Sequence, residues 1–238
     1  MDMVKLAFYG SSFAARHLRA DAIARGFTVV DGGADVAFVC EDAPTNADGK
    51  RDATTINAFL EDAIQECLGS AVVVTSQVEP GFMRRLSTHL RCIGPLYHQA
   101  ETLRVKDARE RARNPEMIVI GCADPTDALP PAYEAYVRSF GCPVLTMSYE
   151  EAEFAKIAIN CTLAVQVDCA NRLSAAASKV GASWEVIANV LRHDSRIGPR
   201  AYLTPGRWQD SPHLLRDDYT LRRIEECTPA TTSEPQPR

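Results

Sequence analysis

The sequence lacks several features that would place it in a particular class of protein. It has no run of about 18 apolar residues, the length that a membrane-spanning helix needs. Its formal net charge of −5 is the wrong sign for a surface that binds nucleic acid or an anionic membrane. A strand is predicted to begin within the first residues, which leaves no room for a signal peptide. We therefore expect a cytoplasmic protein that binds neither nucleic acid nor membrane.

The eight cysteines include no C-x-x-C pair, the spacing typical of structural zinc sites. Most of them lie in or beside apolar segments rather than in long loops. Thiols in such surroundings are usually buried and reduced. The sequence therefore predicts neither a disulfide framework nor a metal site.

Short apolar runs alternate with helical segments through the first part of the chain. The expected strands lie at 4–9, 27–31, 35–40, 71–76, 117–121 and 143–146, and the expected helices at 11–25, 52–68 and 126–139. Strands that alternate with helices indicate a parallel sheet covered on both faces. Residues 1–148 are thus predicted to form an α/β domain, a shortened Rossmann-like doubly wound parallel sheet.

From residue 149 onward the pattern is helical. Residues 150–180 are expected to form one long helix ended by Gly181, and Ser183 is expected to cap a second helix that runs to about residue 191. A short helix near 215–225 completes an α-helical domain over 149–226, and residues 227–238 form a tail predicted to be disordered. Because residues 150–180 are apolar on more than one face, we expect a homodimer through this helix.

The turn between the first strand and helix has part of a nucleotide-binding motif. A dinucleotide fingerprint has three glycines, of which only Gly10 is present here, with Ser12 and Ala15 at the other two positions. Asp31 stands where a carboxylate that binds ribose is expected. The alternative is an ordinary strand–helix turn that binds nothing.

Lys156 and Asn160 lie one turn apart on the same face of the predicted long helix. An ammonium and an amide placed in this way can donate to one ligand and stabilise negative charge on its oxygen. Arg196 and Arg200, in the loop that follows, are suited to phosphate oxygens but could equally be surface charges.

Taken in order, these blocks resemble the UDP-glucose/GDP-mannose dehydrogenase family. The family's A-E-x-x-K-x-x-x-N-x-x-L-A motif is similar to residues 152–164, and R-I-G and P-G follow at 196–198 and 205–206. Its segment that begins P-E-F-L-R-E and ends V-I-G aligns with residues 100–121, where Glu101 and Arg104 are kept. The resemblance covers residues 4–225 and two of the family's three domains.

The resemblance implies oxidation of a sugar nucleotide such as UDP-glucose with NAD as cofactor. The catalytic positions that it implies are Lys156, Asn160, Asp217, Glu101 and His213. The positions implied for the cofactor are Gly10, Ser12, Phe13, Asp31, Pro44 and Thr45. Those implied for the sugar nucleotide are Arg196, Arg200, Tyr202 and Gly206.

Several family positions are changed in this chain. The cysteine of the family's G-G-x-C-x-P-K-D motif is His213, and an imidazole cannot replace a thiolate that carries an acyl intermediate. His213 is either a loop histidine or a general base. A second catalytic glutamate is Val105, a threonine that positions water is Gln77, and a strand and helix after Asp31 are missing.

We therefore expect a family member with reduced or lost oxidation. The alternatives are a non-catalytic protein that binds a sugar nucleotide, a homodimeric scaffold, and a split enzyme whose partner chain supplies the missing domain.

Overall fold

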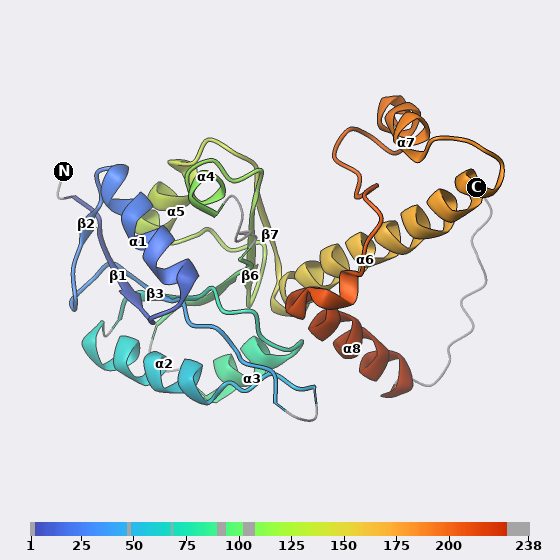
Figure 1. Cartoon of the computed structure of the whole chain (residues 1–238). Helices are drawn as coiled ribbons and strands as arrows, with labels where there is room; N and C mark the ends of the chain where they lie inside the picture. The colour runs from blue at the N-terminus through green and yellow to red at the C-terminus, as the bar shows by residue number, and fades with distance from the viewer. Residues whose placement is uncertain (1–2, 47–48, 68, 90–93, 102–107, 228–238) are drawn as a thin grey trace. The chain divides into compact units, whose positions relative to one another are not determined.

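The computed structural model describes residues 3–46, 49–67, 69–89, 94–101 and 108–227 and divides into two compact units, 1–156 and 157–238 (Figure 1). The first unit contains β1 (Lys5–Tyr9), α1 (Phe13–Ala24), β2 (Thr28–Val29), β3 (Val36–Val39), α2 (Thr54–Glu66), β4 (Ala71–Val74), α3 (Phe82–His89), β5 (Leu96–Gln99), α4 (Ala108–Arg113), β6 (Ile118–Cys122), α5 (Pro131–Arg138) and β7 (Val144–Ser148). The helix α6 (Tyr149–Lys179) begins in this unit and continues into the second.

The seven strands form one sheet in the order β2-β1-β3-β4-β5-β6-β7. Figure 1 shows α1 and α5 on one side of this sheet and α2 and α3 on the other. The inward side chains agree with this arrangement, because Leu18 and Tyr136 pack in one core cluster with Phe38, whereas Leu60 packs in another with Val39. Both faces are thus covered by helices, as predicted for a doubly wound α/β fold.

The prediction that the sheet is parallel throughout is wrong at one strand pair. β5 runs antiparallel to β6, with His98 opposite Gly121, while every other neighbouring pair is parallel. The sequence analysis missed β5 because its residues, L-Y-H-Q, lack the long aliphatic run of the other strands. His98 is nevertheless buried, and burial lowers the pKa of its imidazole to about 4.

Two short helices, α3 and α4, also went unpredicted, and several predicted ends shift by a few residues. The free thiols differ in burial, whereas the sequence predicted that most of them are buried. Cys40, Cys67 and Cys122 are buried, but Cys169 and Cys227 are exposed. Both exposed cysteines lie on the outer faces of helices, where helical position rather than the apolar neighbourhood in sequence decides burial.

The boundary between the two units falls after Lys156 rather than near residue 148, because the first turns of α6 pack on the sheet. Glu153 is only 1% exposed, and its carboxylate accepts hydrogen bonds from the backbone N–H groups of Gly81 at 2.6 Å and Met83 at 2.7 Å. Burial raises the pKa of this carboxyl group, while the two backbone donors act in the opposite direction. A Cβ atom on Gly121 would lie 2.8 Å from the Cβ of Ala152, so α6 approaches β6 closely.

The second unit contains the rest of α6, α7 (Trp184–His193), a 3-10 turn η1 (Trp208–Asp210) and α8 (Pro212–Cys227). Gly181 follows α6 with a φ of +73°, as predicted for a C-cap. Ser183 precedes α7, but its hydroxyl donates to Glu185 instead of accepting from the backbone. No helix in the described ranges is long and apolar enough to cross a membrane.

Glu153→Gln tests the attachment of α6 to the sheet. A glutamine side chain offers one acceptor oxygen to two backbone donors, so one buried N–H loses its partner. We expect the free energy of unfolding, measured by urea denaturation, to fall by about 1–3 kcal/mol. The control is Glu150→Gln, which breaks only an exposed ion pair with Arg84 and should cost no more than about 1 kcal/mol. Equal losses in the two variants would contradict the assignment.

Candidate functional site

The second unit holds a buried polar pair between α6 and α8. Asn160 Nδ2 donates to the Asp217 carboxylate at 2.6 Å, and both residues are buried, Asp217 with 0% exposure. A carboxylate in such surroundings is stable only with hydrogen-bond partners, which fix its position. The same charge, after burial, helps to raise the pKa of the neighbouring Cys161 thiol to about 11, so this cysteine stays protonated.

His213 lies on α8 four residues before Asp217. His213 lies in the first turn of α8 and is exposed, with its Nδ1 3.4 Å from an Nη atom of the buried Arg216. The hydroxyl of Thr220 donates to the Arg216 backbone carbonyl at 3.0 Å. The structure therefore brings three predicted or motif positions, Asn160, Asp217 and His213, onto two packed helices.

The loop between α7 and α8 is tied to α6 through amide side chains. The Asn171 amide donates to the Gly206 carbonyl and accepts from the Gly206 N–H, both at 2.8 Å. Gln166 accepts from the N–H of Tyr202 at 2.8 Å. Tyr202 and Gly206, two of the four sugar-nucleotide positions implied by the resemblance, are thus held to the long helix by their backbones.

The two arginines of this loop that the resemblance implies as substrate contacts are exposed. The Arg196 guanidinium donates to the Asp194 carboxylate at 2.6 and 3.0 Å, so its charge is already paired within the loop. Arg200 is exposed two residues after the R-I-G segment.

Of the remaining predicted catalytic residues, two lie in the first unit. Glu101 is half-buried just after β5, and it lines a small cavity of about 40 Å³ with Thr75 and Arg111. Lys156 is half-buried on α6. Arg104 and Val105 lie outside the described residues, whereas Gln77 is half-buried after β4.

The turn after β1 is occupied by the protein's own side chains. The Glu41 carboxylate accepts from the backbone N–H of Ser11 at 2.6 Å, from its hydroxyl at 3.1 Å, and from the N–H of Asp42 at 2.9 Å. Ser12 accepts from Ala15 N–H at 3.1 Å as the N-cap of α1 and donates its hydroxyl to the Cys40 carbonyl. Glu41 was missed by the sequence analysis, although an acidic residue directly after the buried strand β3 is a signal that could have found it.

The other predicted cofactor positions surround this turn. Gly10 has a φ of +127°, and a Cβ there would lie 2.7 Å from the Cys40 carbonyl oxygen. Phe13 is exposed at the start of α1, and Pro44 and Thr45 are exposed after β3. Asp31 is 93% exposed, 3.4 Å from Arg19.

These residues do not fit the pyrophosphate of a dinucleotide such as NAD. The fold would place the phosphates at the N-terminal end of α1, where backbone N–H groups and the helix dipole favour an anion. In this chain a carboxylate already binds the Ser11 N–H, and Ser12 has a side chain where the fingerprint has glycine.

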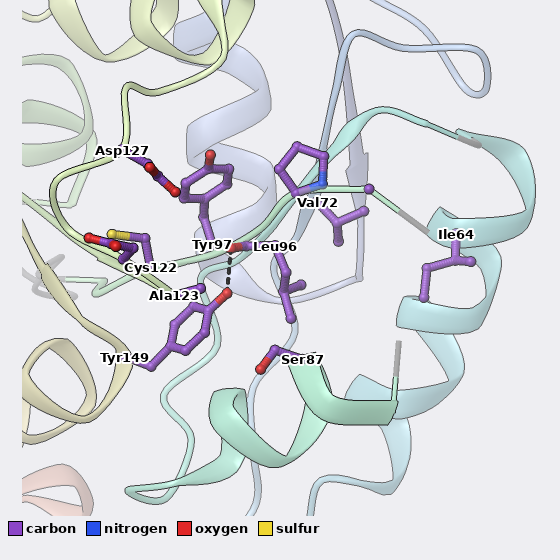
Figure 2. Close-up of a pocket in the computed structure, with 12 residues that line it drawn as sticks. Ile64, Val72, Ser87, Leu96, Tyr97, Cys122, Ala123, Asp127 and Tyr149 are labelled. Atoms are coloured by element: carbon purple, nitrogen blue, oxygen red, sulfur yellow. Dashed lines mark hydrogen bonds between the residues drawn. The ribbon is translucent and has the colours of Figure 1, made fainter. Parts of the chain in front are cut away.

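A pocket of about 240 Å³ lies at the opposite edge of the sheet, next to the amino ends of β4 and β5 (Figure 2). Its lining is mainly apolar, with Ile64, Val72 and Leu96 among the residues that Figure 2 labels. The Tyr149 hydroxyl donates to the Leu96 carbonyl at 2.7 Å, the dashed line in Figure 2. None of the predicted site residues lines this pocket.

Comparison with known proteins first identifies the class. A solved UDP-glucose dehydrogenase from Pyrobaculum islandicum superimposes with a TM-score of 0.67 at 21% identity, covering 94% of this chain and 68% of that chain. A UDP-D-ManNAc dehydrogenase from Pyrococcus horikoshii gives 0.70 at 12% identity, covering 94% and 70%. These likenesses show a Rossmann-like fold.

Sequence comparison then gives the family. The model of the UDP-glucose/GDP-mannose dehydrogenase family's central domain matches residues 150–226. The UDP-glucose 6-dehydrogenase of Pseudomonas aeruginosa is 26% identical over 178 residues, covering 69% of this chain and 39% of that protein. An uncharacterized protein of Methanocaldococcus jannaschii is 28% identical over 174 residues, covering 69% and 19%. Residues 150–226 are thus similar to the central domain of the UDP-glucose/GDP-mannose dehydrogenase family, and the chain spans 19% to 39% of the length of these curated relatives.

Asn160→Ala tests the buried pair. The variant removes a charge-assisted hydrogen bond to the Asp217 carboxylate, and we expect the free energy of unfolding to fall by about 1.5–3 kcal/mol. Asn189→Ala, at an exposed position on α7, is the control and should change it by less than about 0.5 kcal/mol. The loss should shrink when Asn160→Ala is made in an Asp217→Asn background. An equal loss in both backgrounds would show that the two side chains do not act together.

Proposed function

We propose that this chain binds a sugar nucleotide at the face of α6 that carries Lys156 and Asn160, and that it does not complete the oxidation of the sugar to a carboxylate. The observation that carries the proposal is the buried hydrogen bond between Asn160 and Asp217. It holds the Asn160 amide in one orientation, and this fixed orientation is what a binding group requires.

Asp217 has a supporting part in this proposal. Because its side chain is fully buried, it has no surface to offer a ligand, and it acts by positioning Asn160. Lys156, one helical turn earlier and half-buried, supplies the positive charge. Together they provide one ammonium and one oriented amide for the hydroxyl oxygens or phosphate of a sugar nucleotide.

Incomplete oxidation follows from the chemistry at His213. Four-electron oxidation through an acyl intermediate needs a thiolate that attacks the aldehyde carbon and leaves again on hydrolysis. The imidazole at position 213 is exposed and next to the Arg216 guanidinium, and it has no sulfur with which to form the thioester. Cys161, which follows Asn160 on α6, is kept as a neutral thiol by its raised pKa.

A titration of purified protein with UDP-glucose, UDP-glucuronate and GDP-mannose tests the proposal. For the ligand that binds best, we expect Lys156→Ala to weaken binding by about ten- to a hundredfold, because it removes a charge-assisted hydrogen bond. Lys179→Ala, which removes the same charge from the exposed end of α6, should leave the affinity unchanged. Equal affinities for wild type and Lys156→Ala would show that this face is not the binding site.

The same protein, incubated with UDP-glucose and NAD, should give no UDP-glucuronate above the background without enzyme. The reason is that the second oxidation has no acyl carrier. Formation of two NADH per sugar would overturn the reading of position 213. Loss of binding and loss of turnover are separate measurements, so either half of the proposal can fail alone.

A homodimeric scaffold is the second candidate, and the exposed apolar side chains of α6 favour it. Phe154, Val165 and Leu173 are 39%, 66% and 44% exposed on this helix. Apolar side chains gathered on one helix are a common feature of subunit interfaces. By contrast, Ile157 and Ala164 of the same helix are buried within the chain itself.

Val165→Glu tests the dimer. Sedimentation or light scattering at tens of micromolar should give a dimer for the wild type and a monomer for the variant, because a charge cannot be buried in an apolar interface without a partner. Ile23→Glu places the same charge at a similarly exposed apolar position on α1 and should leave the dimer intact. A wild type that is monomeric at this concentration would exclude the scaffold.

A further inference from the structure

We infer that Glu41 acts as an internal substitute for the cofactor's phosphate, and that its carboxylate closes the nucleotide-binding turn of this domain to NAD. The inference goes beyond the proposed function, because it concerns the sheet domain and not the Lys156 and Asn160 face. It rests on the contacts of a single side chain with the turn between β1 and α1.

The Glu41 carboxylate is bound through both of its oxygens. One oxygen accepts both from the Ser11 backbone N–H, at 2.6 Å, and from the Ser11 hydroxyl, at 3.1 Å. Its other oxygen accepts from the Asp42 N–H at 2.9 Å. The N-terminus of a helix favours a nearby anion through its dipole, and α1, which begins two residues after Ser11, has no acidic residue of its own in the first turn.

A side chain also stands at the second glycine position of the turn. The Ser12 hydroxyl donates to the Cys40 carbonyl, and this bond ties α1 to the end of β3. The fingerprint places glycine at the Ser12 position so that the pyrophosphate can approach the backbone, and here a side chain and a hydrogen bond take that space.

The charge of Glu41 opposes a dinucleotide as well. A pyrophosphate at this turn would have to displace the Glu41 carboxylate or remain beside it, and two anions so close repel each other.

The experiment measures anion binding at this turn, with inorganic pyrophosphate as the probe so that the missing adenosine wall does not matter. Wild type, Glu41→Ala and Glu41→Gln are titrated by calorimetry and by amide NMR of ¹⁵N-labelled protein at low ionic strength. We expect no saturable binding to the wild type. For Glu41→Ala we expect binding at least about tenfold tighter than any wild-type limit, with shifts at the Ser11, Ser12 and Phe13 amides.

A second Glu41 variant and a control variant complete the experiment. Glu41→Gln keeps a side chain of the same size and removes the charge, so it answers the question if Glu41→Ala does not fold. Glu61→Ala removes the same charge from an exposed position of α2 and should gain nothing.

Pyrophosphate or NAD binding by the wild type at these amides would overturn the inference. So would the absence of any gain in both Glu41 variants, or an equal gain in Glu61→Ala. None of these outcomes depends on whether a sugar nucleotide binds at Lys156, so the inference and the proposed function can fail separately.

Discussion

The attachment of the first turns of α6 to the sheet is the constraint on which the rest of the chain depends. Glu153 is buried on α6, where a carboxylate is costly, and it is tolerated because two backbone N–H groups at the start of α3 donate to it. Gly121 on β6 leaves no room for a side chain where α6 passes. These contacts fix where the helix begins. Because α6 is continuous, its start also fixes the helical phase at which Lys156, Asn160 and every later side chain of the helix emerge.

The helical unit and the sheet unit of this chain differ in how their motif positions are bonded. In the helical unit the motif positions still form a buried, hydrogen-bonded centre, with Asn160 oriented by Asp217 and the following loop tied to α6 through Asn171 and Gly206. In the sheet unit the turn between β1 and α1 is hydrogen-bonded to a carboxylate of the chain itself, that of Glu41, through the Ser11 N–H. The turn before α1 is already bonded to a carboxylate and gains little from an added anion, whereas the Asn160 amide donates one hydrogen to Asp217 and keeps a second one.

The alternation of apolar runs and helices was enough to predict the α/β sheet and the long helix. Strands such as Val36–Val39 and Ala71–Val74 consist entirely of buried apolar residues, the pattern of a central parallel strand. β5 could not be found in this way, because a tyrosine and a histidine interrupt its apolar character, and its antiparallel direction depends on the connection rather than on its own residues. The same limit applies to the candidate site. The spacing of Lys156 and Asn160 follows from helical geometry, but the Asn160–Asp217 and Glu41–Ser11 bonds join residues distant in sequence, which spacing alone does not reveal.

Asp217 shows why burial has to enter the assignment of roles. The family motif gives it a place among the catalytic positions, yet a side chain with 0% exposure can act on a ligand only through the group that it holds. In this chain that group is the Asn160 amide, whose Nδ2 donates to the Asp217 carboxylate. An asparagine that donates one amide hydrogen to a buried carboxylate keeps its second hydrogen and its carbonyl oxygen for other partners. The hydrogen bond to Asp217 therefore fixes the orientation of the Asn160 amide and leaves it a donor and an acceptor for other partners. Lys156 adds a positive charge, which favours an anionic partner.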